Sequence, residues 1–238
     1  MKTVLVNGGS RGIGAAMVRA FVAAGYAVAF TYFASDAEAD ALSQETGALA
    51  IKADSGSREE IGAAVEKCLK VFGQIEVLIN NAAISYFGLF TDMADSLWDR
   101  MVAVNLDGPM QYAKCVLPQM ISRKCGKIIN ISSMWGQVGA SCEVPYSVTK
   151  AGLIGFTKAL AKEVGPSGIT VNAIAPGVIA TEMNARLSEE DLEALKEETP
   201  LSRIGTPEEV AAVALFLCGE GGAFLTGQVI SPNGGFVM

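Results

Sequence analysis

The chain of 238 residues contains no histidine. This absence excludes Ser-His-Asp and Cys-His catalysis, together with every metal site that uses an imidazole ligand. Proton transfer must therefore rely on Asp, Glu, Tyr, Lys or Cys side chains. Cysteine is also scarce: the five Cys residues are scattered, odd in number and without a C-x-x-C pair, which argues against a zinc centre and a disulfide framework. We expect reduced thiols and no bound metal.

Positive charge and long apolar runs are equally limited. The net charge is −7 and no basic run exceeds Arg123-Lys124, so a nucleic-acid groove is not expected. The N-terminal run in MKTVLVNGG is too short for a signal peptide or a membrane span, and the apolar stretch 15–34 is interrupted by Arg19 and Gly25. The sequence therefore predicts a cytoplasmic protein without membrane partners.

Short β-rich runs alternate with longer helical segments. Strands are predicted at 3–7, 26–32, 48–53, 76–80, 127–132, 169–175 and 227–231. Three capping-box patterns predict helix starts, namely Ser35-x-x-Glu38, Ser57-x-x-Glu60 and Thr206-Pro207-Glu208-Glu209. Such continuous apolar strands suit a parallel sheet covered on both faces. We predict one α/β domain over 1–238, a three-layer, doubly wound parallel sheet, with a flexible helical flap at about 180–205.

A glycine cluster, NGGSRGIG at 7–14, follows the first predicted strand directly and precedes a helical segment. Glycine lets the backbone approach a pyrophosphate closely, and the next helix offers free N–H groups and the positive end of its dipole. A tight strand-helix turn without any ligand is the alternative interpretation. The flanking strand and helix favour the phosphate site.

Three further motifs end predicted strands or begin a helix. NNAA at 80–83 closes the fourth strand, where two amides could either hold neighbouring strands or face a ligand. NISSMWG at 130–136 places Ser133 at the end of another strand, and alone it fits a turn-forming serine. PYSVTK at 145–150 puts Tyr146 and Lys150 four residues apart, on one face of a helix. Alone, that pair is typical of a solvated surface.

Together, the order and spacing of these motifs resemble the short-chain dehydrogenase/reductase family over essentially the whole chain. The resemblance includes the glycine cluster, NNAA, and the segment NAIAPGVIAT at 172–181. It implies a Rossmann fold and a catalytic set of Asn105, Ser133, Tyr146 and Lys150. Asn7 and Ala83 depart from the Thr and Gly that are usual in the family. Asn7 can still hydrogen-bond across the turn, and Ala83 adds one methyl group.

By this resemblance, Tyr146 donates a proton to a carbonyl oxygen while a hydride leaves the nicotinamide for the carbonyl carbon. Ser133 hydrogen-bonds the same oxygen, Lys150 holds the nicotinamide ribose and biases the tyrosine, and Asn105 anchors a water leading to solvent. An ammonium about 4 Å from a phenolic oxygen is worth roughly 4 kcal/mol at an effective dielectric of ~20, or about three pKa units. Such a lysine could bring a phenol near neutrality.

For the cofactor we predict NADP(H), with NAD(H) as the alternative. Arg11 could meet a 2′-phosphate with help from Ser35 and Thr31 or Tyr32, whereas Asp36 fits a structural role in the first turn of a helix. By resemblance, Asp54 approaches the adenine and Asn80 the adjoining ribose. The predicted cofactor contacts are Gly8, Ser10, Arg11, Gly12, Ile13, Gly14, Tyr32, Ser35, Asp54, Ser55, Asn80, Ala82, Tyr146, Lys150, Pro176, Gly177, Ile179 and Thr181.

For the substrate, VNLDG, YSVTKAGLIGFTKALAKEV and TGQVISPNGG resemble the 3-oxoacyl-acyl-carrier-protein reductases. Arg123, Lys124 and Lys127 could then dock an acidic carrier protein near the mouth of the site, although Ser167 replaces an Arg often found there. The loop SSMWGQVGASCEVPYS instead resembles the elongation factor P 5-aminopentanone reductases, which reduce a ketone attached to a lysine of that protein.

A small free ketone and a steroid alcohol remain as alternative substrates. A non-catalytic cofactor-binding scaffold remains as the alternative to an enzyme. The family resemblance also implies a homotetramer or homodimer. Its contacts would come from the helix beginning at Tyr146 and from the C-terminal strand and helix. Leu153, Phe156 and Leu160 on that helix would suit such contacts, but they would suit core packing equally well.

Overall fold

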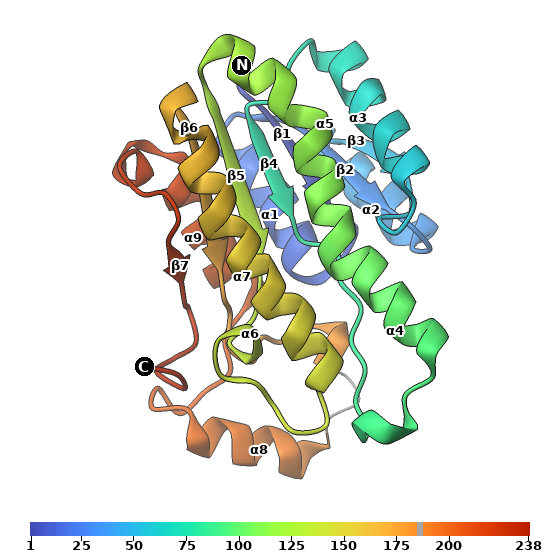
Figure 1. Cartoon of the computed structure of the whole chain (residues 1–238), viewed down its shortest axis with the longest axis vertical. Helices are drawn as coiled ribbons and strands as arrows, with labels where there is room; N and C mark the ends of the chain where they lie inside the picture. The colour runs from blue at the N-terminus through green and yellow to red at the C-terminus, as the bar shows by residue number, and fades with distance from the viewer. Residues whose placement is uncertain (185–187) are drawn as a thin grey trace.

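The computed structural model describes residues 1–184 and 188–238, which form a parallel sheet between two layers of helices (Figure 1). The strand order is β3-β2-β1-β4-β5-β6-β7, and every neighbouring pair is parallel. The strands are β1 Thr3–Asn7, β2 Ala27–Tyr32, β3 Leu49–Lys52, β4 Val77–Asn80, β5 Gly126–Ile131, β6 Ile169–Ile174 and β7 Val229–Ile230. The predicted doubly wound sheet is confirmed, and the predicted strand bounds differ from these mainly at strand ends.

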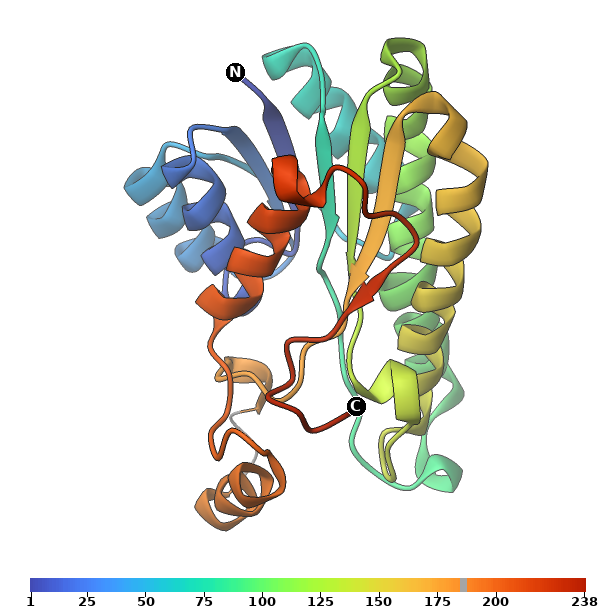
Figure 2. The same cartoon turned by 90° about the vertical axis from the view of Figure 1, so that its left-hand side faces the viewer.

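The helices cover both faces of this sheet. Figure 2 shows α1 and α9 on one side, and α5 and α7 on the other. The helix bounds are α1 Gly12–Ala23, α2 Asp36–Thr46, α3 Arg58–Phe72, α4 Asp95–Val102, α5 Gly108–Arg123, α6 Trp135–Val138, α7 Val144–Val164, α8 Glu189–Glu198 and α9 Pro207–Cys218. Strand order reverses beside β1, which pairs with both β2 and β4. A doubly wound sheet binds its ligands at the carboxyl ends of strands at such a point.

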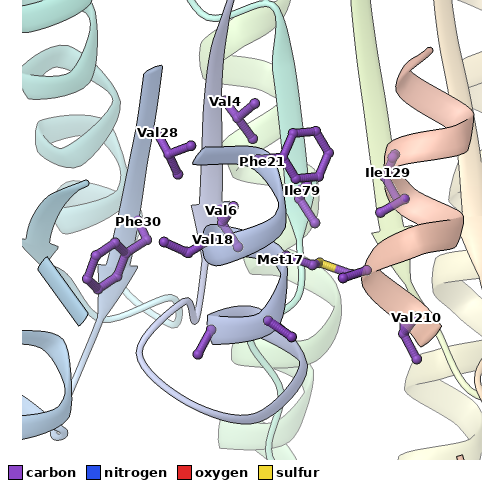
Figure 3. Close-up of a cluster of buried hydrophobic side chains, with 14 of the residues drawn as sticks. Val4, Val6, Met17, Val18, Phe21, Val28, Phe30, Ile79, Ile129 and Val210 are labelled. Carbon is purple, nitrogen blue, oxygen red and sulfur yellow. The ribbon is translucent and has the colours of Figure 1, made fainter. Parts of the chain in front are cut away.

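Successive side chains of each strand point to opposite faces of the sheet. Because helices cover both faces, the strands are continuous apolar runs in the sequence. Val4 and Val6 of β1 pack with α1 and α9, whereas Leu5 between them packs with the helices of the other face. Figure 3 shows the first of these two cores, in which Met17 and Phe21 of α1 lie against the strands. Both faces are therefore buried, and the carboxyl edge of the sheet is left to form the site.

The capping predictions had mixed outcomes. Thr206 forms a complete capping box with Glu209. Ser57 accepts a hydrogen bond from the Glu60 backbone, but the Glu60 carboxylate accepts from the Asp54 backbone instead of closing a box. The prediction was wrong at Ser35, whose side chain makes no capping hydrogen bond. Side-chain oxygens near a helix start have several N–H groups to choose from, and the sequence does not rank them.

The cysteine prediction is consistent with the structure. All five thiols are free, and Cys68 and Cys218 are buried in the two cores. Burial raises the pKa of each of these two thiols to about 12, which makes them poor nucleophiles at neutral pH. Across residues 1–184 and 188–238, no helix combines the length and apolarity that a membrane crossing requires.

Candidate active site

The glycine cluster forms a tightly packed turn between β1 and α1. Gly8 and Gly12 have φ of 65° and 51°, in the left-handed region that favours glycine. A Cβ at Gly8 would lie 2.7 Å from Ala82 Cα, and a Cβ at Gly14 would collide with the Gly8 carbonyl oxygen. The turn therefore brings bare backbone and the amino end of α1 to one place. This arrangement fits the pyrophosphate of a dinucleotide.

Buried asparagines tie the ends of β1, β4 and β5 together. The Asn7 side chain donates to Asn80 Oδ1 at 2.8 Å, and its own Oδ1 accepts from the backbone N–H groups of Asn81 and Ala82, each at 2.7 Å. Asn80 in turn donates to Asn130 Oδ1 at 2.8 Å. Asn7 thus bonds across the turn as expected, although the family usually has Thr there.

This network bears on the predicted role of Asn80. Its side chain is 1% exposed, and its amide atoms are bonded to Asn7, Asn130 and the Pro109 carbonyl. Of the two interpretations left open by the sequence, the structure supports holding neighbouring strands. The Asn80 side chain is not placed to face a ribose, so that part of the prediction needs correction.

The loop after β6 folds back against the glycine turn. The Pro176 carbonyl accepts from the Met134 N–H at 3.0 Å, and Gly177 packs so closely on Asn233 that a Cβ there would lie 2.8 Å from its Cα. Ile179 is buried, and the Thr181 methyl carbon would be 3.3 Å from a Cβ at Gly12. The two predicted cofactor-binding segments therefore line the same place, with Ser10 and Ile13 on the glycine turn.

Ser133 lies just past the carboxyl end of β5 and is buried, with 8% of its surface exposed. Its Oγ accepts a hydrogen bond from the Trp135 N–H at 3.2 Å, which leaves its own proton available to donate. The neighbouring Ser132 donates to the Lys150 carbonyl at 2.9 Å. The end of β5 is therefore fastened to α7 beside the predicted catalytic pair.

Tyr146 and Lys150 lie in the first two turns of α7 and do not form a solvated face. Their exposed fractions are 9% and 2%. The Lys150 ammonium lies 5.6 Å from the centre of the Tyr146 ring and donates to the Ile131 carbonyl at 2.7 Å. Burial lowers the pKa of Lys150 to about 7. The sequence argument used a permanently charged ammonium, whereas burial opposes that charge near neutral pH.

Asn105 lies in a π-helical turn, Ala103–Asp107, between α4 and α5. Such turns occur frequently at functional sites. Its side chain is fully buried, accepts from the Ile84 N–H at 2.9 Å and donates to the Ile84 carbonyl at 2.8 Å. It also lies 3.3 Å from Thr149 Oγ1 on α7. These contacts connect the loop after β4 to α7, next to the predicted catalytic pair.

At the end of β2, Tyr32 and Lys52 face each other across the β2–β3 register. Lys52 Nζ pairs with both carboxylate oxygens of Asp36, at 2.8 and 2.9 Å, which supports the structural interpretation of Asp36. This hydrogen bond lowers the pKa of the Asp36 carboxyl. Arg11 is exposed at the start of α1, and Ser35 is partly buried before α2. Lys52 was not among the predicted residues, because its neighbourhood depends on strand register.

The Asp54 carboxylate, two residues past β3, is paired with an arginine that the sequence argument did not name. Both its oxygens pair with Arg100 of α4, and the adjacent Ser55 is buried. Nothing in the sequence links residues 46 positions apart on a strand end and a helix.

The basic residues proposed for docking a carrier protein were wrongly placed. Arg123 and Lys124 end α5, and Lys127 begins β5, at the amino edge of the sheet, whereas Ser133 and α6 lie at its carboxyl edge (Figure 1). Arg123 pairs with Glu76 at 3.1 Å, and Lys127 donates to the Leu217 carbonyl at 3.2 Å. They do not flank the mouth of the site within one chain.

The predicted flap at about 180–205 contains α8. This helix begins with a complete capping box between Ser188 and Asp191. Figure 1 shows α8 beyond the carboxyl edge of the sheet. Residues 185–187 of the predicted flap lie outside the described residues. Within the described ranges, no group of three or more Cys, Asp or Glu side chains is arranged to hold a metal ion.

Comparisons with known proteins agree with this geometry. A family model described as enoyl-(acyl carrier protein) reductase matches residues 8–237. The chain therefore belongs to this family of short-chain dehydrogenases/reductases, and it is an oxidoreductase acting on CH–OH and C=O groups.

Three relatives illustrate the match. The chain is 43% identical to a 3-oxoacyl-[acyl-carrier-protein] reductase of Aquifex aeolicus, covering 98% of this chain and 96% of that protein. It is also 43% identical to an acetoacetyl-CoA reductase of Shinella zoogloeoides, covering 98% of each. A solved short-chain dehydrogenase/reductase from Serratia marcescens superposes with a TM-score of 0.91 at 36% identity, covering 99% of this chain and 97% of that one. These matches confirm the family and fold inferred from the motifs.

Proposed function

We propose that the protein is an NADP(H)-dependent reductase of a 3-oxoacyl thioester. One observation carries the reaction class: the buried Tyr146 and Lys150 lie together near the start of α7, and Ser132 bonds this helix to the end of β5, where Ser133 follows. This strand end lies at the carboxyl edge of the sheet, where β1 also leads into the glycine turn (Figure 1). The relatives named as 3-oxoacyl and acetoacetyl reductases support a substrate with a ketone one carbon away from a thioester. Retention of the whole catalytic set opposes a non-catalytic scaffold.

The glycine turn, the 176–181 segment and Lys150 would hold the dinucleotide. When bound, its reduced nicotinamide supplies the hydride. Tyr146 then donates its phenolic proton to the ketone oxygen, and the Ser133 hydroxyl donates a hydrogen bond to that oxygen. Lys150 is fixed by the Ile131 carbonyl, so its ammonium stays beside the Tyr146 ring. Asn105 would hold a water on the solvent side of Lys150.

The charged side chains near the end of β2 support NADP(H) over NAD(H). Arg11 is exposed on the glycine turn, and Lys52 lies across from Tyr32. Asp36, the nearest carboxylate to this strand end in the chain, is already paired with Lys52. A free carboxylate at this strand end would favour a ribose hydroxyl, whereas an exposed arginine such as Arg11 favours a 2′-phosphate.

A ketone carried on another protein, such as keto-modified elongation factor P, is the second candidate substrate. Helix α8, beyond the carboxyl edge of the sheet, carries one lysine, Lys196, and six carboxylates, on Glu189, Glu190, Asp191, Glu193, Glu197 and Glu198. An acidic carrier protein approaching this edge would be repelled at low salt. A neutral or basic carrier would not be.

NADPH oxidation with a panel of ketones tests these assignments. We expect activity on acetoacetyl-CoA and a KM for NADPH at least about tenfold below that for NADH, because a 2′-phosphate contact of charged groups is worth 1.5–3 kcal/mol. The panel includes acetoacetyl-acyl carrier protein, keto-modified elongation factor P, a small ketone and a steroid ketone. Activity confined to the elongation factor substrate would select the second candidate. Cofactor binding without turnover of any ketone would contradict the enzyme assignment.

We also propose a cytoplasmic homotetramer or homodimer. The exposed face of α7 includes Val148, Ala151 and Gly155, and the C-terminal region exposes Phe216 and Phe224. Exposed apolar side chains on two separate faces would suit two kinds of self-contact. Leu153 and Leu160, by contrast, are buried within the chain and serve the core. A light-scattering mass near that of one subunit would contradict this proposal.

A further inference from the structure

The Asp54 carboxylate lies two residues past β3 and is held in one orientation. Arg100 Nη2 lies 2.7 Å from Asp54 Oδ1, and Arg100 Nη1 lies 2.8 Å from Oδ2, a bidentate pair. The Gly56 N–H also donates to Oδ1 at 2.8 Å. The two side chains are 17% and 36% exposed, so the pair is largely shielded while one side still reaches solvent. Parallel N–H donors of this kind fix the carboxylate plane.

A count of acceptor positions shows what Asp54 can still bind. Each oxygen of an ionised carboxylate has about two acceptor positions. Oδ1 uses both, for Arg100 and Gly56, whereas Oδ2 uses one, for Arg100. The hydrogen bonds from Arg100 hold the pKa of the Asp54 carboxyl below its usual range, so the group carries no proton to donate at neutral pH. Asp54 can accept one more hydrogen bond, at Oδ2, and can donate none.

Arg100 itself is also held by a ring contact and by close packing on Gly56. Its guanidinium carbon lies 5.5 Å from the centre of the Phe33 ring, which follows β2, in a cation–π arrangement. A Cβ at Gly56 would collide with the guanidinium and would lie 3.3 Å from Val104. Arg100 therefore joins the loop after β2, the loop after β3 and helix α4 at the carboxyl edge of the sheet. Glycine at position 56 makes the close approach of Arg100 sterically feasible.

We propose that Arg100 is a positioning residue for cofactor recognition, which orients Asp54 so that its remaining acceptor position binds the exocyclic amine of adenine. The inference rests on the proposed function, because it requires an adenine dinucleotide in the groove. It makes a chemical distinction: a purine with an amino group supplies the required donor, whereas the oxo group of hypoxanthine is an acceptor and meets the carboxylate unfavourably. Arg100 thus contributes base selectivity without contacting the nicotinamide.

The test compares the binding of NADPH with that of its hypoxanthine analogue, deamino-NADPH, by fluorescence titration of the full chain. We expect the wild type to bind NADPH roughly 10- to 100-fold more tightly, the range for a hydrogen bond to a charged group. Arg100→Met should bring the two dissociation constants within about threefold, mainly by weakening NADPH. At saturating NADPH its kcat should change less than about twofold, because the reacting end is untouched.

Two further variants make the outcome decisive. Arg100→Lys retains the positive charge but not the two parallel N–H donors of the guanidinium, so it should show only part of the wild-type selectivity. It also replaces Arg100→Met as the test variant if the Met variant does not fold. Arg19→Met removes another bidentate arginine, which pairs with Glu45 at 2.7 and 2.8 Å and not with Asp54, and it should keep wild-type selectivity.

Each alternative result has a distinct meaning. If Arg100→Met folds and keeps the wild-type preference, or if both Arg100 variants lose kcat and binding for the two cofactors equally, the positioning role is overturned. A wild type that binds both dinucleotides equally overturns the inference and leaves the proposed function intact. A wild type that binds neither dinucleotide overturns both.

Discussion

Tyr146→Phe is expected to lower kcat for ketone reduction by about 10²- to 10⁴-fold, the usual contribution of a positioned proton donor. The dissociation constant for NADPH should stay within about twofold of the wild type. The phenolic oxygen is lost but the ring remains, so the packing around this largely buried residue and its contact with Lys150 are preserved. Steady-state kinetics and fluorescence titration measure the two quantities separately.

The matched control for this substitution is Tyr26→Phe. It removes the same hydroxyl from a tyrosine that packs edge-on against Phe21, before the amino end of β2, at the opposite edge of the sheet. The control should retain wild-type kcat. A Tyr146→Phe enzyme with near wild-type kcat would remove Tyr146 from the proton-donor role, whereas a loss of NADPH binding equal to the loss of kcat would indicate a cofactor-binding role instead.

Lys150→Met is expected to abolish most turnover and yet to stabilise the fold near neutral pH. Burial lowers the pKa of Lys150 from 10.5 to about 7, so protonating this lysine is less favourable in the folded than in the unfolded chain. That difference corresponds to about 5 kcal/mol as an upper limit. The Met side chain cannot donate to the Ile131 carbonyl, and this loss offsets about 1–3 kcal/mol of that stabilisation. A net gain on the order of 2 kcal/mol below pH 7 remains.

The pH dependence gives this prediction its sign. Below about pH 7 the lysine is protonated in both states, and the wild type carries the full penalty. Between about pH 7 and 10.5 the unfolded chain binds more protons than the folded one, so wild-type stability rises with pH. The advantage of Lys150→Met should therefore shrink across this window. Urea denaturation at several pH values, compared with the exposed Lys158→Met on the same helix, measures it.

A pH-independent gap between Lys150→Met and the wild type would contradict the burial argument. A growing gap as pH rises would contradict it more strongly, since it would mean that the folded state favours the charged lysine. Lys158→Met should show neither trend, because its ammonium lies in water in both states.

Much of the fold was predictable because strand patterns and turn chemistry are local. Continuous apolar runs such as that in β1 indicate strands buried on both faces, and Val4, Leu5 and Val6 indeed divide between two cores. The glycine turn was also predictable, since the flanking strand and helix and the glycine spacing are all close in sequence. The hydrogen bonds of the Ser35 and Glu60 side chains were less predictable, because each side chain has several backbone N–H groups within reach.

The sequence by itself determined the reaction class, because the order and spacing of the glycine turn, Ser133, Tyr146 and Lys150 resemble those of the short-chain dehydrogenase/reductase family. Only the tertiary structure decided which side chains remain available. It assigned the Asn80 amide to the sheet and paired Asp54 with Arg100, and it placed Lys127 at the wrong edge for docking a carrier. These outcomes depend on strand register, burial and pairing between distant residues, and a linear pattern does not encode such long-range distances.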